Sequence, residues 1–341
     1  MSLKLKKLSE QTIVITGATS GIGLVTARLA AKRRAKLMLV ARSESSLQRL
    51  AEEIRGQHGN AEYVCADVAD HNLVQRVAEK AIEKFGGFDT WVNNAGVSIY
   101  GKIEDVSLAD QRKLFETNYW GVVHGSLVAA GHLKTKGGAI INVGSALSDR
   151  ALPLQGTYCA SKHAIKAFTD ALRMELEHDG APVSITLIKP SSIDTPYRRH
   201  AKNFLPAEPK NPAPVYAPDP VADAILYAAE HPVRDLYVGA AGWALSTAAF
   251  VAPRLVDKAM EHLMFEAQQF DRPSTSPHTG LDQPSSSLRE RGGYDGHVAR
   301  TSLMTRATTH PVLSWGLIAA GIGLGYAFKR HLRSRTKHHA N

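Results

Sequence analysis

Residues 12–23 read Thr-Ile-Val-Ile-Thr-Gly-Ala-Thr-Ser-Gly-Ile-Gly, and this stretch decides the fold. Its first five residues have the apolar, β-branched composition of a buried parallel strand. The glycines that follow lead into a segment from Leu24 to Lys32 that is typical of a helix. A strand, a glycine-rich turn and a helix in this order favour phosphate binding, because the backbone can approach the ligand and the helix N-terminus attracts negative charge. The alternative is a plain tight turn in which glycine only provides positive φ.

Strands and helices alternate along the chain beyond this turn. Further strands are predicted at 36–41, 61–66, 88–92, 139–143, 184–188 and 235–238, and helices at 44–58, 70–85, from 108 onward and at 220–230. Such alternation favours an α/β fold in which helices cover both faces of a parallel sheet. We therefore expect a doubly wound, Rossmann-like sheet in a single domain over residues 1–270.

The net charge of +9 lies in the two ends of the chain. Residues 1–8 and 329–341 carry +8 of it and no acidic residue, which leaves +1 for the residues between them. A basic nucleic-acid-binding surface is therefore not expected. The two cysteines, Cys65 and Cys159, and the scattered histidines form no disulfide or metal-site pattern, which suits a reducing compartment and predicts no metal.

Tyr158 and Lys162 stand four residues apart in a segment typical of a helix, so their side chains project from the same face. A fixed ammonium beside a phenol lowers the pKa of the phenol and makes it a better acid or base at neutral pH. The same spacing is more often found on ordinary helix surfaces. Two polar residues precede the pair, Asn118 within a predicted helix and Ser145 just after a predicted strand. Ser145 thus lies at the edge where parallel α/β sheets bind their ligands.

The turn Thr16-Gly17-Ala18-Thr19-Ser20-Gly21-Ile22-Gly23 resembles the cofactor motif of the short-chain dehydrogenase/reductase family. The resemblance covers about residues 10–240, and Asn118, Ser145, Tyr158 and Lys162 are similar to the catalytic tetrad of that family in order and spacing. It implies hydride transfer between a nicotinamide cofactor and a carbonyl or alcohol carbon. Tyr158 is then the acid or base, and Lys162 lowers its pKa and binds the nicotinamide ribose. Ser145 is expected to bind the reacting oxygen, and Asn118 to widen its helix and support proton relay through a water.

The resemblance also implies a set of cofactor-binding residues. They are Gly17, Thr19, Ser20, Gly21, Ile22, Gly23, Arg42, Asp67, Val68, Asn94, Ala95, Gly96, Tyr158, Lys162, Pro190, Ile193 and Thr195. The second predicted strand ends at Arg42 without the acidic residue that NAD-preferring enzymes use to bind the ribose hydroxyl. A guanidinium can bind a 2′-phosphate bidentately, so we expect NADP(H). A solvated surface arginine is the alternative reading of Arg42.

Two segments near the end of the predicted domain bear on the substrate. Residues 196–220 are irregular and lie where the family places a substrate lid, although a solvated loop is an equal alternative. Residues 243–270 are expected to form one or two helices around Pro253, with an apolar face that packs on the body or lies against a membrane.

The composition changes after residue 270. Residues 271–310 are rich in Pro, Ser and Gly without a period, which predicts a flexible, disordered linker. Residues 311–329 contain an uncharged run long enough for a transmembrane helix, and residues 330–341 form a basic tail. A buried hairpin or an amphipathic cover helix is the alternative for the uncharged run. With no signal peptide readable, we expect a single-pass C-terminal membrane anchor with the catalytic domain facing the cytoplasm.

Two hypotheses for function follow. The first is a membrane-anchored, NADP(H)-dependent carbonyl reductase or alcohol dehydrogenase for a small-molecule substrate, with a lipophilic substrate suggested by the anchor. Family resemblance also implies a homo-oligomer. The second is a dinucleotide-binding scaffold or sensor at a membrane that has lost turnover, and the intact tetrad argues against it.

Overall fold

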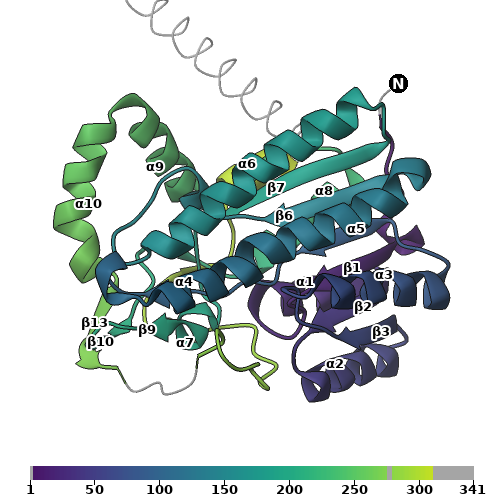
Figure 1. The fold of residues 1–341 in the computed structure, drawn as a ribbon, viewed down its shortest axis with the longest axis horizontal. Coiled ribbons are helices and arrows are strands. Elements are labelled where there is room, and N and C mark those ends of the chain that lie inside the picture. The colour runs from purple at the N-terminus through teal and green to yellow at the C-terminus, as the bar shows by residue number, and fades with distance from the viewer. Residues whose placement is uncertain (1–2, 275–278, 310–341) are drawn as a thin grey trace, which may run out of the picture.

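The computed structural model describes residues 3–274 and 279–309, and a seven-stranded parallel sheet forms its centre (Figure 1). The strand order is β12-β7-β6-β4-β1-β2-β3. The strands are β1 (Thr12–Thr16), β2 (Lys36–Ala41), β3 (Asn60–Cys65), β4 (Thr90–Asn93), β6 (Gly138–Val143), β7 (Val183–Pro190) and β12 (Asp235–Val238). The chain moves outward from β1 to β3 and then crosses back to β4, so the topological switch point lies between β1 and β4. The predicted doubly wound parallel sheet is confirmed.

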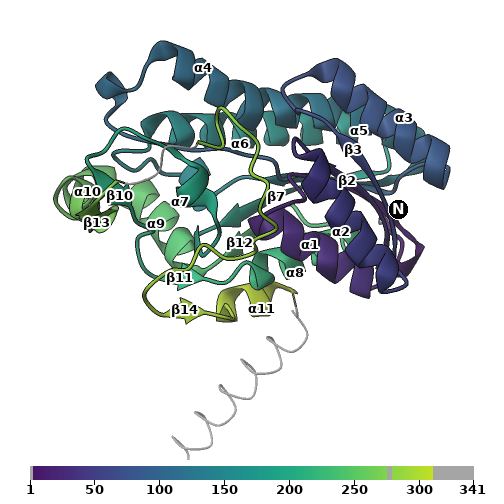
Figure 2. The same cartoon turned by 90° about the horizontal axis from the view of Figure 1, so that it is seen from below.

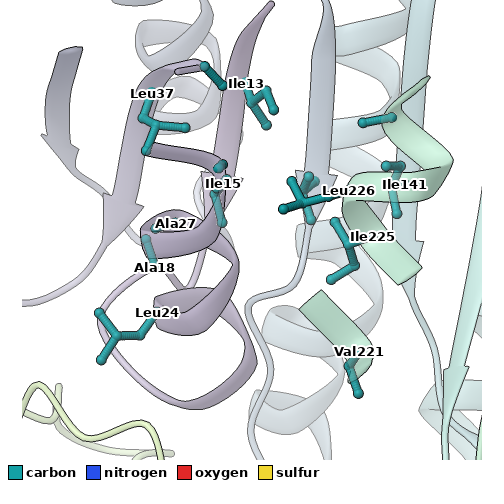
Figure 3. Close-up of a cluster of buried hydrophobic side chains, with 14 of the residues drawn as sticks. Ile13, Ile15, Ala18, Leu24, Ala27, Leu37, Ile141, Val221, Ile225 and Leu226 are labelled. Carbon is teal, nitrogen blue, oxygen red and sulfur yellow. The ribbon is translucent and has the colours of Figure 1, made fainter. Parts of the chain in front are cut away.

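Helices cover both faces of this sheet (Figure 2). One face carries α1 (Gly21–Lys32), α2 (Glu44–Gly56) and α8 (Asp219–Glu230), and the other carries α3 (His71–Phe85), α5 (Gly121–Lys136) and α6 (Gly156–His178). The side chains of β1 point alternately to the two faces of the sheet. Ile13 and Ile15 pack with residues of α1 and α8 (Figure 3). Val14 belongs to the hydrophobic cluster on the opposite face. All three side chains are fully buried. A strand buried on both faces explains why residues 12–16 contain no charged residue.

Short elements complete the edge of the sheet at the strand carboxyl ends. They are the helices α4 (Leu108–Phe115) and α7 (Tyr197–His200) and the short strands β5 (Ile99–Tyr100), β8 (Ser192–Ile193), β9 (Lys202–Asn203) and β11 (Val215–Tyr216). Strand β5 pairs with β9, and β8 pairs with β11. The irregular region at 196–220 therefore has local order and is not a simple solvated loop.

Helices α9 (Ala240–Val251) and α10 (Pro253–Ala267) form a hairpin beside the strand ends, as predicted around Pro253 (Figure 1). Its outer side is apolar and exposed, with Phe250 90%, Val251 75% and Leu255 74% accessible. Its inner side carries Leu245, Met260 and Met264, which line a cavity of the body. Of the two alternatives for its apolar face, packing on the body therefore holds for the inner side.

The prediction of a flexible linker after residue 270 is wrong for the described residues of that segment. Strand β13 (Gln269–Pro273) pairs with β10 (Ala207–Pro209), and β14 (Val298–Ala299) pairs with β11. Helix α11 (Leu303–Thr309) follows, and Thr305 hydrogen-bonds the Tyr237 carbonyl oxygen at the edge strand β12. The segment is held by dispersed polar contacts and by single apolar side chains such as Leu281, without a periodic apolar face, so the composition did not reveal its order.

No helix within residues 3–274 and 279–309 is long and apolar enough to cross a membrane. The transmembrane helix predicted at 311–329 and the basic tail at 330–341 lie outside the described residues.

Candidate active site

The glycine-rich turn brings two backbone segments into direct contact at the start of α1. Gly17 and Gly21 adopt positive φ values of 66° and 51°. A Cβ atom at Gly23 would lie 2.2 Å from the Gly17 carbonyl oxygen, so no other residue fits there without moving the turn. The turn therefore needs glycine for both conformation and close packing, as a dinucleotide-binding turn does.

The segment from Asn93 to Gly96, at the end of β4, holds this turn in place. The Asn94 side chain donates to the Thr16 and Gly17 carbonyl oxygens at 2.9 and 3.3 Å. The backbone amides of Asn94 and Ala95 both donate to the Thr16 hydroxyl. These bonds join the ends of β1 and β4 at the switch point and so fix the position of the glycine-rich turn.

Asn118 lies in a wide helical turn, Glu116–Trp120, that has π-helical hydrogen bonding between α4 and α5. Its buried side chain exchanges two hydrogen bonds with the backbone of Val97 and donates to the Ser161 hydroxyl at 3.1 Å. The widened helix predicted at this residue is confirmed, and π-turns are frequent at functional sites.

Ser145, Tyr158 and Lys162 converge next to Gly96. A Cβ atom at Gly96 would lie 3.5 Å from Asn118 Oδ1 and 4.0 Å from Lys162 Nζ. Lys162 Nζ donates to the Val143 carbonyl oxygen at 2.9 Å and lies 5.6 Å from the centroid of the Tyr158 ring. The structure thus brings the four predicted catalytic residues into one buried group.

The net pKa of Tyr158 is raised in this structure, whereas the sequence predicts a lowered one. Burial raises the pKa of the Tyr158 phenol to about 12, although hydrogen bonds with Tyr197 and Ser145 oppose the rise. Burial also lowers the pKa of the Lys162 ammonium to about 8. Both groups lie out of water, so desolvation is the larger effect for each.

Arg42 and Asp67 mark the other end of the site, where β2 and β3 end. Arg42 Nη1 lies 4.0 Å from an Asp67 carboxylate oxygen, and Arg42 also donates to the Gly280 carbonyl oxygen. They border a cavity of about 110 Å³ that several predicted cofactor residues line. Those residues are Gly17, Thr19, Ser20, Arg42, Asp67, Val68, Ala95 and Gly96.

A larger cavity of about 380 Å³ lies over the catalytic group. The predicted site residues that line it are Ile22, Asn94, Gly96, Ser145, Tyr158, Pro190, Ile193 and Thr195. Gly96 borders both cavities, so the 110 Å³ cavity and the 380 Å³ cavity are neighbours that meet at this residue. Gly21, Gly23, Asn118 and Lys162 line neither cavity and lie behind the residues that do.

The remaining wall of the large cavity is mostly apolar and comes from segments that the sequence did not assign to the site. It includes Leu147, Leu152, Pro212, Leu245, Met260 and Met264. The helical periodicity of 243–270 predicted an apolar face on the hairpin, but nothing in the sequence placed that face against Tyr158.

Tyr197 is a further residue that the sequence did not single out. Its ring centroid lies 5.4 Å from that of Tyr158, and its hydroxyl oxygen lies within hydrogen-bond distance of the Ser98 hydroxyl, at 2.6 Å, and of Gln155 Oε1, at 3.2 Å. Its hydrogen bond with Tyr158 lowers the pKa of Tyr158, against the larger effect of burial. Tyr197 therefore belongs to the polar floor of the cavity.

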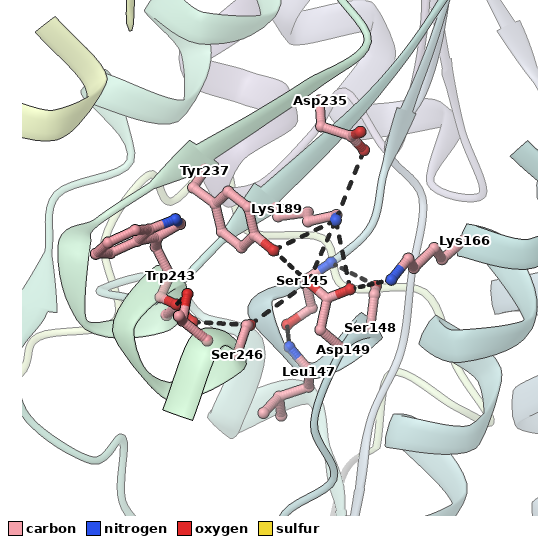
Figure 4. Close-up of polar contacts among 12 residues, drawn as sticks. Ser145, Leu147, Ser148, Asp149, Lys166, Lys189, Asp235, Tyr237, Trp243 and Ser246 are labelled. Carbon is pink, nitrogen blue, oxygen red and sulfur yellow. Dashed lines mark hydrogen bonds and ion pairs between the residues drawn. The ribbon is translucent and has the colours of Figure 1, made fainter. Parts of the chain in front are cut away.

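Asp149 anchors the loop that follows Ser145 (Figure 4). Its carboxylate accepts from the Tyr237 hydroxyl at 2.6 Å, pairs with Lys166, and lies 3.2 Å from Lys189 Nζ. Ser246 of α9 also donates to it at 3.5 Å. This network connects the Ser145 loop to α6, β7, β12 and the hairpin that forms the cavity wall.

We expect Asp149→Asn to lower the free energy of unfolding by about 3 kcal/mol at pH 7, because it removes the nearer of the two carboxylates that pair with the buried Lys189 ammonium and leaves only the longer contact with Asp235. Lys189 and Asp149 side chains are only 6% and 10% exposed. Burial alone raises the pKa of Asp149, but Lys166, Tyr237 and Lys189 overcome it and the net pKa is lowered. The stabilisation is thus present above the pKa of an unfolded aspartate, near 4, and lost as pH falls through the lower folded pKa.

Chemical denaturation of both proteins between pH 3 and pH 8 measures this difference. Asp179→Asn is the matched control, since it breaks an exposed pair with Lys134 and should change stability by no more than about 0.5 kcal/mol. If the difference in free energy of unfolding between wild type and Asp149→Asn grew toward pH 3, the pKa of Asp149 would not be lowered by folding.

The two cavities and the turn between them fit a nicotinamide dinucleotide. The turn packs backbone against backbone at Gly17 and Gly23, which leaves room for a pyrophosphate beside Thr19 and Ser20. Arg42 borders the cavity at one end and Tyr158 the cavity at the other. The donor set therefore matches a phosphate-containing ligand at one end and a proton-transfer site at the other.

Comparisons with known proteins agree with this geometry. A family model described as short chain dehydrogenase matches residues 11–205. The chain is 45% identical over 332 residues to YxnA, an uncharacterized oxidoreductase of Bacillus subtilis (strain 168), covering 96% of this chain and 93% of that protein.

Solved structures show the same fold. An alcohol dehydrogenase from Thermococcus sibiricus complexed with 5-hydroxy-NADP is 27% identical with a TM-score of 0.59, covering 67% of this chain and 95% of that one. A short-chain dehydrogenase/reductase from Burkholderia phymatum in complex with NAD is 25% identical with a TM-score of 0.62, covering 81% and 100%. The chain is therefore an oxidoreductase that belongs to the short-chain dehydrogenase/reductase family.

Proposed function

We propose that the protein is an NADP(H)-dependent reductase or dehydrogenase of lipophilic ketones, aldehydes or alcohols. The observation that carries this proposal is the placement of Tyr158 and Ser145 at one side of a 380 Å³ cavity whose other walls are mainly apolar. Ligand sites typically combine such an apolar lining with a few fixed polar groups. An apolar carbonyl compound would place its one polar atom at the two hydroxyl groups.

The arrangement supports proton donation at neutral pH. A phenol with a pKa of about 12 is protonated there, so Tyr158 can give its proton to a carbonyl oxygen that Ser145 binds. Lys162, with a pKa of about 8, still carries its charge at pH 7 and opposes the cost of forming a buried phenolate. The bound nicotinamide would supply the hydride that reaches the carbonyl carbon.

The preference for NADP(H) rests on Arg42. It borders the small cavity, and its fork of donors matches a 2′-phosphate. No acidic residue follows β2 directly, and Asp67, after β3, lies 4.0 Å from Arg42. Ile193 and Thr195 at the large cavity are proposed to contact the nicotinamide carboxamide.

A panel of carbonyl compounds tests the proposal while NADPH absorbance is followed at 340 nm. Decanal, 2-decanone and a decalone represent apolar substrates, and pyruvate and glyceraldehyde represent small polar ones. We expect turnover with members of the first group. Tight NADPH binding without turnover of any compound would instead favour the dinucleotide-binding scaffold.

We also propose that the catalytic domain faces the cytoplasm and is held at a membrane by a single C-terminal anchor at 311–329, supported by the uncharged run in the sequence. Deleting residues 311–341 should move the protein from the membrane fraction to the soluble fraction after carbonate washing. A truncated protein that still sediments with membranes would mean that another segment, such as the exposed face of α9–α10, holds it there. The proposed homo-oligomer rests on the family resemblance, and light scattering of the purified protein measures it.

A further inference from the structure

We infer that residues 279–294, which we name the strap, form the outer wall of the cofactor site and control how fast the nicotinamide dinucleotide leaves. The inference rests on the proposed cofactor site. It concerns a segment that lies outside the matched family region and that composition alone marked as a linker. Figure 2 shows its light green trace passing between α7 and α1.

The strap lines the cavity at the Arg42 end of the site. Gly280, Pro284 and Ser285 border it, opposite Gly17 and Thr19 of the glycine-rich turn. The Gly280 carbonyl oxygen accepts a hydrogen bond from Arg42 Nη2, and the guanidinium has further N–H donors with which it could also bind a phosphate. A ligand in this cavity would therefore contact the glycine-rich turn on one side and the strap on the other.

The strap also closes over the start of α1. The Arg289 carbonyl oxygen accepts from the Gly21 amide at 2.9 Å, and Glu290 pairs with Arg28 of α1 at 2.7 Å. The Ser286 carbonyl oxygen accepts from Ser46 of α2 at 2.9 Å. These bonds hold the strap against the two helices that flank the glycine-rich turn.

On the other side of the site, the strap is tied to the segments that follow β7. The Asp194 carboxylate accepts from the backbone amides of Gly292 and Tyr294, both at 3.1 Å. A Cβ atom at Gly292 would lie 2.2 Å from the Thr195 carbonyl oxygen, so the two backbones are in close contact. The strap thus bridges the two halves of the sheet across the switch point, where dinucleotides bind.

The first residues of the strap are anchored near the catalytic group. Leu281 is 1% exposed and packs in a cluster with Tyr158, Val97 and Leu114. Asp282 pairs with Lys113 at 2.8 Å and with Lys202 at 3.5 Å. A cofactor in the site would be enclosed between these anchors and those at Arg289 and Asp194, so it can exchange only when some of them open.

The test is the rate at which bound NADPH leaves the full-length protein. Stopped-flow fluorescence measures it when the complex is mixed with excess NADP⁺, and NADH with excess NAD⁺ gives a second reading. The variant Asp282→Asn/Glu290→Gln removes three ion pairs that hold the strap without changing a residue that lines either cavity. Because an exposed ion pair is worth up to about 1 kcal/mol, we expect release to accelerate roughly five- to twentyfold.

Asp179→Asn/Glu261→Gln is the matched control. It makes the same two chemical changes in exposed pairs with Lys134 and Lys258, away from the strap, and should keep the wild-type release rate within twofold. Hydrogen exchange is an independent measurement, in which bound NADPH should slow amide exchange in the peptide that covers residues 279–294. It also reports whether the strap variant keeps a folded sheet.

Equal release rates in the strap variant and the control, or strap exchange that NADPH leaves unchanged, would overturn the inference. Either result leaves the proposed function standing. Wild-type protein that binds neither NADPH nor NADH would contradict the proposed function, and the inference with it.

Discussion

Tyr158→Phe is expected to lower kcat for carbonyl reduction by about 10²- to 10⁴-fold and to leave the dissociation constant for NADPH within roughly threefold of wild type. The substitution removes only the phenol hydroxyl, which lies at the large cavity and hydrogen-bonds Ser145. The aromatic ring remains, so its packing with Tyr197 and Leu281 is kept. The loss should therefore appear in the chemical step and not in cofactor binding. Steady-state kinetics and NADPH fluorescence titration measure the two quantities separately.

Tyr216→Phe is the matched control for this substitution. Tyr216 and Tyr158 are both 9% exposed, but Tyr216 lines neither cavity and lies in β11. Removing its hydroxyl should change kcat by less than threefold. Activity of Tyr158→Phe similar to that of Tyr216→Phe would show that another group donates the proton, and Tyr197 would be the first residue to examine.

Arg42→Asp is expected to reverse the cofactor preference. The substitution removes charge-assisted hydrogen bonds to a 2′-phosphate, worth about 1.5–3 kcal/mol, and so should raise the dissociation constant for NADPH roughly 10- to 100-fold or more. NADH carries a ribose hydroxyl at this place, which an aspartate can bind, so its affinity should hold or improve. Fluorescence titration with both cofactors gives the ratio directly.

Arg76→Asp makes the same change of charge on an exposed residue of α3 and should leave the ratio unchanged. If Arg42→Asp keeps the wild-type preference for NADPH over NADH, Arg42 is not the residue that selects the cofactor. Because Arg42 also donates to Gly280 of the strap, release rates of this variant would show whether strap contacts changed as well.

Local patterns in the sequence predicted the fold and the catalytic group. Gly17, Gly21 and Gly23 are required by backbone geometry within one turn, and Tyr158 and Lys162 are neighbours on one helix. Such constraints act over a few residues, so they are readable without the structure. The alternation of strands and helices then determined the parallel sheet.

The environment of the site could not be predicted in the same way. The pKa of Tyr158 depends on burial, to which Leu281 contributes from 123 positions away in the chain. Several contacts of the strap are made by the carbonyl oxygens of Gly280, Ser286 and Arg289, and any residue type can supply a backbone carbonyl. Its lack of hydrophobic periodicity therefore resembled disorder, although its described residues are ordered by contacts with distant parts of the chain.

Transfer of deuterium from the reactive face of [4-²H]NADPH shows directly whether the protein moves a hydride from the cofactor to a carbonyl carbon. Wild-type protein is incubated with the labelled cofactor and 2-decanone or decanal, and the product alcohol is analysed by mass spectrometry. We expect one deuterium on the carbinol carbon for each NADPH consumed, with formation of this product lost in Tyr158→Phe and retained in Tyr216→Phe. Undiminished formation of the labelled alcohol by Tyr158→Phe, or NADPH that binds tightly while no carbonyl in the panel is reduced, would contradict this expectation.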